Sequence, residues 1–232
     1  MGNKYIFCKD ECDICNKFFS DKIEQHLIWF YDSELLFYGK KEHKIKNRFL
    51  SAYKNDNGVE ILIKDNSLAD VLFLHNFIPT LKLEHAQKFI PECVYKILCK
   101  FVICFLDEND LELVEDTIAW ILGDLNLPSD NYWAQVLSFD IKPQLYPQLK
   151  IFLIKTDCYP DKQAMIGEFF FMRTFWKFRI PLLKNDLPMS VIDATKTYKL
   201  NGQDITKQLT SNRIIDLSVN TPQSLISTLQ LY

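Results

Sequence analysis

Glycine is scarce in this sequence, with 6 glycines in 232 residues. Immunoglobulin-type β-sandwiches and glycine-rich nucleotide-binding folds both need many turns with positive φ angles, so this scarcity argues against both. Neither the Gly-x-Gly-x-x-Gly fingerprint nor the Gly-x4-Gly-Lys-Ser/Thr loop occurs. Rossmann and P-loop nucleotide binding therefore have no support, and we expect no nucleotide cofactor.

Long apolar runs are also missing. A transmembrane helix needs about 18 consecutive apolar residues, and the best approach, residues 94–106, is interrupted by Lys96 and Lys100. The N-terminus has no basic segment followed by a long apolar stretch, so no secretory signal is visible. The 7 cysteines are an odd number, which fits reduced thiols better than a disulfide framework. We therefore expect a cytoplasmic protein with no membrane partner.

Hydrophobic residues are plentiful, at 48% of the chain, and 18 of them are phenylalanines. That composition supplies a sizeable core and excludes global disorder. The net charge of −3 is unevenly distributed. One run is basic and contains Lys40, Lys41, Lys44, Lys46, Arg48 and Lys54. A later run is acidic and contains Asp107, Glu108, Asp110, Glu112, Glu115, Asp116 and Asp124. This segregation predicts two faces of opposite charge.

The spacing of apolar residues predicts helices over most of the chain after residue 67. They cover residues 68–77, 83–90, 92–106, 109–122, 132–139, 145–154 and 160–179. Earlier in the chain, strands are expected at residues 4–8, 26–31, 35–38 and 59–63, with a basic amphipathic helix at 42–53. Gly123 follows one predicted helix directly, and Asn201-Gly202 predicts a hairpin turn.

These elements predict an α+β fold that is mainly helical and has three parts. Residues 1–64 form a small β-hairpin module with a cysteine knuckle and the basic helix. Residues 65–187 form a larger helical domain, in which the strongly apolar helix at 92–106 is central to the core. Residues 188–232 form a polar tail that contains some β-structure or is irregular.

The cluster Cys8-Lys-Asp-Glu-Cys12-Asp-Ile-Cys15 has the clearest chemical spacing in the chain. A Cys-x2-Cys knuckle presents two thiolates to one zinc ion, and Cys12 and Cys15 have that spacing. Cys8 and His26 would be the third and fourth ligands, with His43 as a substitute. The alternative is that these cysteines are ordinary thiols on a strand and a loop. If zinc is bound, a structural site is favoured over a catalytic one.

The knuckle followed by Ile23-Glu-Gln-His-Leu-Ile28 resembles the opening of an HNH-type nuclease. In that family a histidine lies on a β-hairpin after the knuckle, and a later helix supplies further ligands. The resemblance implies that His26 is the general base that activates water, with His43 and Asn47 at the later positions. It also implies metal-assisted phosphodiester hydrolysis. The phosphates would then be neutralised by Lys40, Lys41, Lys44, Lys46 and Arg48.

The second unusual segment is Phe169-Phe-Phe-Met-Arg-Thr-Phe-Trp-Lys-Phe178. On the predicted helix its aromatic residues would surround the axis, so the helix would be buried on most sides or would cover a partner. Arg173 and Lys177, four residues apart, would share one exposed strip. If this helix contacts a partner, its anchors would be Tyr159, Arg173 and Trp176, because Trp, Tyr and Arg dominate binding hot spots.

No set of convergent catalytic residues emerges, so we expect a non-catalytic subunit that binds other proteins in a larger cytosolic assembly. An assembly that handles nucleic acid would suit the basic helix. One alternative is the HNH-like metal-dependent nuclease. Another is an antitoxin-like inhibitor, in which Glu112, Glu115 and Asp116 present an acidic face to a basic partner. Zinc is the one cofactor that the sequence makes a case for.

Overall fold

The computed structural model describes most of the chain in segments. They are residues 13–31, 35, 50–53, 60–63, 80–84, 88–127, 133–139, 141–182, 186–188, 198–200, 202–214, 216–223 and 226–230. The predicted elements at 4–8, 36–38 and 68–77 and the basic run at 40–48 lie outside these residues.

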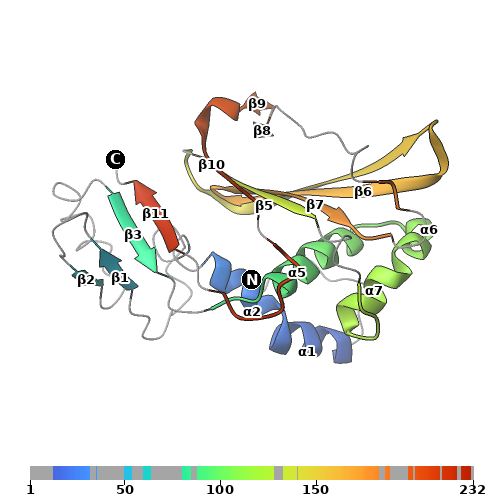
Figure 1. The fold of residues 1–232 in the computed structure, drawn as a ribbon, viewed down its shortest axis with the longest axis horizontal. Coiled ribbons are helices and arrows are strands. Elements are labelled where there is room, and N and C mark those ends of the chain that lie inside the picture. The colour runs from blue at the N-terminus through green and yellow to red at the C-terminus, as the bar shows by residue number, and fades with distance from the viewer. Residues whose placement is uncertain are drawn as a thin grey trace.

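A five-stranded antiparallel sheet is the larger of the two main sheets (Figure 1). Its strands lie in the order β10-β4-β7-β6-β5. Their bounds are β4 Ala134–Phe139, β5 Gln144–Thr156, β6 Tyr159–Met172, β7 Thr174–Ile180 and β10 Leu209–Ile214. Consecutive strands β5, β6 and β7 form two hairpins, whereas β10 comes from a distant part of the chain to pair with β4. The sheet therefore has β5 at one edge and β10 at the other.

A layer of helices covers one face of this sheet (Figure 1). The helices are α1 Asp13–Lys22, α2 Glu24–Phe30, α5 Pro91–Ile103, α6 Glu108–Leu111 and α7 Glu115–Leu122, with the 3-10 turn η1 Glu112–Val114 before α7. Helix α5 is central, since Tyr95, Leu98 and Val102 are fully buried. Helices α2 and α7 both contact α5.

The opposite face of the sheet is covered by the C-terminal part of the chain. There β8 Lys199–Leu200 and β9 Gln203–Asp204 form a small hairpin, followed by the 3-10 turn η4 Thr206–Gln208. Tyr198, Leu200 and Ile205 pack on this face. The central strands of the sheet are thus buried on both faces, between the helices and the C-terminal segment.

Side chains alternate between the two faces along each central strand, as the pleat requires. On β7, Trp176, Phe178 and Ile180 join the core under the helices, whereas Phe175 joins the core under the C-terminal segment. On β6, Phe169 and Phe171 face the helices and Phe170 faces the other way. This double burial explains why the segment is aromatic at nearly every position.

A second, four-stranded antiparallel sheet has the strand order β11-β3-β1-β2 (Figure 1). Its strands are β1 Leu50–Tyr53, β2 Glu60–Ile63, β3 Thr80–Glu84 and β11 Ile226–Gln230. Backbone hydrogen bonds in both directions between Phe89 and Gln223, at 3.0 and 2.7 Å, pair the residues that precede α5 and β11.

A buried ion pair fixes the chain where it leaves β7. Arg179 Nη2 lies 2.7 Å from Asp186 Oδ1, and both side chains are shielded from water. Asp186 Oδ2 also accepts a hydrogen bond from the Leu182 N–H at 3.1 Å, and the Arg179 guanidinium donates to the Leu187 carbonyl. The carboxylate and guanidinium therefore hold Asp186 and Leu187 against the first half of β6, where Gln163 forms a bridge with Asp186.

The expected mainly helical α+β fold is wrong. The segments predicted as helices at 132–139, 145–154 and 160–179 are β4, β5 and the β6–β7 hairpin. The predicted helix at 83–90 overlaps the end of strand β3. The basic helix predicted at 42–53 overlaps strand β1. The predicted strand at 26–31 is helix α2 instead.

Other local predictions are confirmed. The apolar helix expected at 92–106 is α5, and it is buried as its narrow polar stripe indicates. Gly123 ends α7 in the left-handed conformation, with φ of 92°. The strand expected at 59–63 is β2, and Gly202, with φ of 81°, lies in the turn between β8 and β9. Each of these features depends on local sequence signals.

Candidate interaction surface

The predicted zinc and nucleic-acid sites fall mainly on residues that the structure leaves undescribed. Cys8, Cys12 and His43 are outside the described segments, as are Lys40, Lys41, Lys44, Lys46 and Arg48. Cys15 lies within α1, and only its backbone is described. Among the side chains that are described, no group of three potential metal ligands comes together. The zinc site and the basic surface therefore stay predictions.

His26 is described, and it lies in α2 rather than on the β-hairpin that the nuclease resemblance implies. Its side chain is buried, and Nδ1 accepts a hydrogen bond from the Ile90 N–H at 3.2 Å. The ring also packs edge-on against Trp29, with 4.7 Å between ring centroids. Burial lowers the pKa of the His26 imidazole, because the charged form loses its hydration. In this setting the side chain joins α2 to the start of α5.

The residues predicted to contact a partner or to share an exposed strip on a helix at 160–179 lie on strands and a turn instead. Trp176 is fully buried, and its Nε1–H donates a hydrogen bond to the Tyr31 hydroxyl at 2.8 Å. Lys177, expected on an exposed helical strip with Arg173, is buried on β7. Arg173 lies in the β6–β7 turn, where its Nε–H donates to the Phe139 carbonyl at 3.2 Å. Trp176 is therefore a core residue, and of the three predicted anchors only Tyr159 is exposed.

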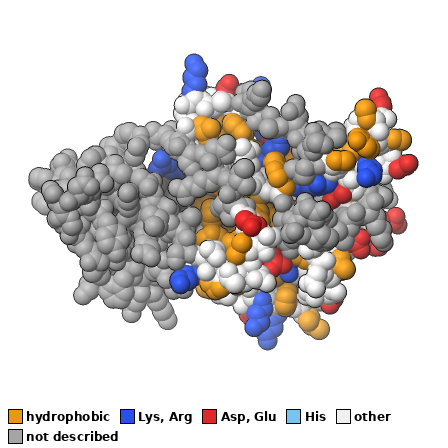
Figure 2. Space-filling view, in the orientation of Figure 1, with side chains coloured by type: hydrophobic (Ala, Val, Ile, Leu, Met, Phe, Trp, Pro, Cys, Tyr) orange, Lys and Arg blue, Asp and Glu red, His pale blue; other side chains and the backbone are white. Residues whose placement is uncertain are grey.

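The most exposed apolar surface lies on the hairpin formed by β5 and β6. Within the described residues, eight large hydrophobic side chains are exposed, and five of them belong to this hairpin: Leu145 (40%), Tyr146 (73%), Phe152 (43%), Leu153 (42%) and Tyr159 (39%). On the face drawn in Figure 2, hydrophobic, basic and acidic side chains lie together at the end of the molecule where Figure 1 places the hairpin tip.

Strand β5 is also an open edge, because no other described strand pairs with its outer side. The hairpin is long: β5 pairs with β6 as far as Thr156 and Tyr159, whereas β7 pairs with β6 only over Met165–Phe171. The tip therefore extends beyond the rest of the sheet, as Figure 1 shows. Its two-residue turn is stabilised by the Thr156 hydroxyl, which accepts a hydrogen bond from the Cys158 N–H at 3.3 Å. An open edge with apolar side chains is a template for adding a strand from another chain.

Three charged side chains form a row across the sheet at the middle of β5. Lys150 on β5 is the cross-strand neighbour of Glu168 on β6, which is in turn the neighbour of Lys177 on β7. Partial burial raises the pKa of the Glu168 carboxyl, and the positive charges of Lys177 and Lys150 oppose that rise. The row thus alternates positive, negative, positive, and it ends on the exposed Lys150 at the edge.

The acidic segment predicted from sequence forms α6, η1 and α7. Glu112 and Glu115 are exposed, and Asp116 is half-buried. These carboxylates lie on the short helices that follow α5. Val114, Thr117 and Trp120, on the inner side of these short helices, are buried. The segment therefore presents its charges to solvent while its apolar side anchors it to the core.

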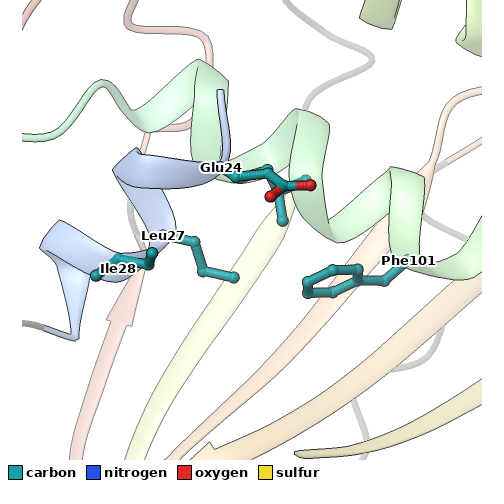
Figure 3. A pocket seen from close by; sticks show the side chains of 5 residues that line it. Glu24, Leu27, Ile28 and Phe101 are labelled. Carbon is teal, nitrogen blue, oxygen red and sulfur yellow. The ribbon is translucent and has the colours of Figure 1, made fainter. Parts of the chain in front are cut away.

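A small hollow lies between α2 and α5 (Figure 3). It has a volume of about 50 Å³ and is lined by Glu24, Leu27, Ile28, Ile97 and Phe101. Lys100 Nζ lies 3.2 Å from Glu24 Oε1 at its rim. This space holds a few water molecules at most, far less than a small-molecule site needs.

Comparison with family models, with curated proteins and with solved structures finds no match to this chain. None of the described helices is long and apolar enough to cross a membrane. Among the described residues, the β5–β6 hairpin carries most of the exposed large hydrophobic side chains.

Proposed function

We propose that this protein is a non-catalytic, cytosolic interaction subunit of a larger assembly, and that it binds its partner through the β5–β6 hairpin. The observation that carries the proposal is the concentration of exposed apolar side chains on an open edge strand. Single exposed hydrophobic residues are normal on protein surfaces, whereas a cluster on one element marks an interaction site.

Strand addition fits this surface better than binding on a flat face. Phe152 and Leu153 are neighbours on β5, so their side chains leave opposite faces of the sheet. A strand laid along the edge would contact both of them and would also satisfy the outward backbone groups of β5. The exposed residues at the tip, including Tyr159, would extend the contact past the end of β7.

The test is site-specific photo-crosslinking in the cells that produce the protein. A photoreactive phenylalanine analogue replaces Phe152 in one variant and Phe105 in a control variant. Both positions are exposed phenylalanines, at 43% and 57%, but Phe105 follows α5 and is not part of the hairpin. We expect a discrete protein adduct from position 152 and none of that mass from position 105. Equal patterns from the two positions, or no adduct from position 152, would contradict the proposal.

An inhibitor that presents an acidic face is a second candidate, because Glu112 and Glu115 are exposed on the α6–α7 segment. Replacing Glu112, Glu115 and Asp116 by glutamine would then weaken partner binding and reduce its dependence on salt. If the hairpin proposal is correct instead, the same variant keeps its crosslink from position 152.

A further inference from the structure

We infer that the β5 edge selects an extended acidic partner segment, in which two carboxylates five residues apart flank a pair of apolar residues. The inference rests on the proposed function and adds the chemistry of the partner. It comes from the motif Lys150-Ile-Phe-Leu-Ile-Lys155, which occupies the second half of the open edge strand.

The charge row across the sheet sets the first position. Directly opposed side chains on neighbouring strands interact, and opposite charges there stabilise the pairing. Lys150, Glu168 and Lys177 already alternate in sign across three strands. A partner strand added outside β5 places one of its residues opposite Lys150. A carboxylate at that place continues the alternation, whereas a lysine or arginine puts two positive charges side by side.

Lys155 sets the second position. It is exposed, and its cross-strand neighbour on β6 is Gln163, which carries no charge. Because Lys150 and Lys155 are five residues apart, they lie on opposite faces of the sheet. The partner therefore needs its second carboxylate five residues from the first, and its chain direction does not matter to this spacing.

Phe152 and Leu153 occupy the two central places of the four between the lysines, one on each face, and both are exposed. The partner residues opposite them would be apolar, since cross-strand apolar pairs exclude water from the edge. The complement of the β5 motif is therefore acid-x-apolar-apolar-x-acid. This pattern is symmetric, so a strand in either direction satisfies it.

The same lysines argue against a second copy of β5 as the partner. Strand β5 contains two lysines and no carboxylate over its 13 residues. Pairing two β5 strands would bring four positive charges to one edge with no carboxylate from either strand between them. Like charges placed opposite each other on neighbouring strands destabilise the pairing, so β5 does not favour a second copy of itself.

The experiment selects from a library of random twelve-residue peptides displayed on phage. The baits are the full wild-type chain, a Lys150→Glu/Lys155→Glu variant and a Lys17→Glu/Lys22→Glu control. The control pair is also exposed and five residues apart, but it lies on α1. Circular dichroism checks that each variant is folded. Wild type and control should enrich the acid-x-apolar-apolar-x-acid pattern, and the edge variant should enrich the same pattern with lysine or arginine in place of the acids.

Binding of a selected acidic peptide should weaken about 10-fold or more in the edge variant and stay unchanged in the control. Selected peptides without paired acids, the same peptides from all three baits, or no enrichment with wild type would each overturn the inference. If the crosslink from position 152 persists in any of these cases, the proposed function stands and only the partner chemistry is wrong. If that crosslink is also absent, both fail.

Discussion

Gly167 offers a sharp test of how tightly the core under the helices is packed. It lies on β6, directly opposite Phe178 on β7. A β-carbon built at this position would lie 2.4 Å from Phe178 Cζ and within 3 Å of both Cε atoms. The Phe178 ring is fully buried, so it cannot move aside into solvent. The ring occupies the space that any other residue at position 167 would need.

We expect Gly167→Ala to destabilise the protein by about 1–3 kcal/mol, the usual cost of overpacking a core. The higher strand propensity of alanine offsets only about 0.5–1 kcal/mol of the strain. Phe178→Leu alone should cost roughly 1–2 kcal/mol through lost contacts. The smaller leucine leaves room for the methyl group. The double variant should therefore lose less unfolding free energy than the two single variants lose in total, by at least about 1 kcal/mol.

The assay is urea unfolding followed by circular dichroism, applied to wild type, both single variants and the double variant. Gly202→Ala is the control, since φ of 81° makes alanine unfavourable there although the added β-carbon would meet nothing within 4 Å. Its cost should be independent of Phe178→Leu. A neutral or stabilising Gly167→Ala, or strictly additive effects with Phe178→Leu, would refute the packing argument.

Three further outcomes follow from other buried groups. Since burial lowers the pKa of His26 in the folded protein, stability should fall as the pH drops below about 6.5, the unfolded value. His26→Asn keeps a hydrogen-bond acceptor but does not titrate, so between pH 7.5 and pH 5.5 it should lose less stability in urea unfolding than wild type does. An equal loss would exclude His26 as a source of this pH dependence. Arg179→Ala should lower the free energy of unfolding by about 3–5 kcal/mol, because it leaves the Asp186 carboxylate buried without its cation. In thermal unfolding, the double variant Arg179→Ala/Asp186→Ala should recover part of this lost stability. Site-resolved alkylation at pH 8 should modify the exposed Cys158 at least about tenfold faster than Cys93, because burial raises the pKa of the Cys93 thiol to about 11; similar rates would contradict that burial.

The sequence predicts the elements whose signals are local. Helix α5 follows from the apolar pattern of residues 92–106, and Gly123 marks the end of α7. The β6–β7 hairpin was missed because its two faces are both buried, and a strand that is apolar on both faces resembles a buried helix. Its enrichment in phenylalanine was the signal that favoured a strand.

The sequence of that hairpin's turn also lacks the residues that usually indicate a turn. The pairing of Phe171 with Thr174 leaves Met172 and Arg173 as a two-residue loop, in which Met172 has φ of 55°. Such loops usually contain glycine or asparagine, and neither occurs here. The candidate surface was missed for the same reason, since residues 145–154 interpreted as a helix do not form an edge. With β5 recognised as a strand, the lysines at 150 and 155 and the apolar pair between them would have identified it.

Each of the two larger sheets is completed by a strand that is synthesised late. Strand β10 pairs with β4, and β11 at 226–230 pairs with β3 at 80–84. During synthesis, β3 and β4 therefore each lack a neighbour until a strand from a distant, later part of the chain has emerged. Such long-range pairing slows folding, and unpaired edges are prone to aggregate in the meantime. Deleting β11 would leave β3 as the edge of its sheet, so the four-stranded sheet stays open to pairing with other chains until β11 is in place.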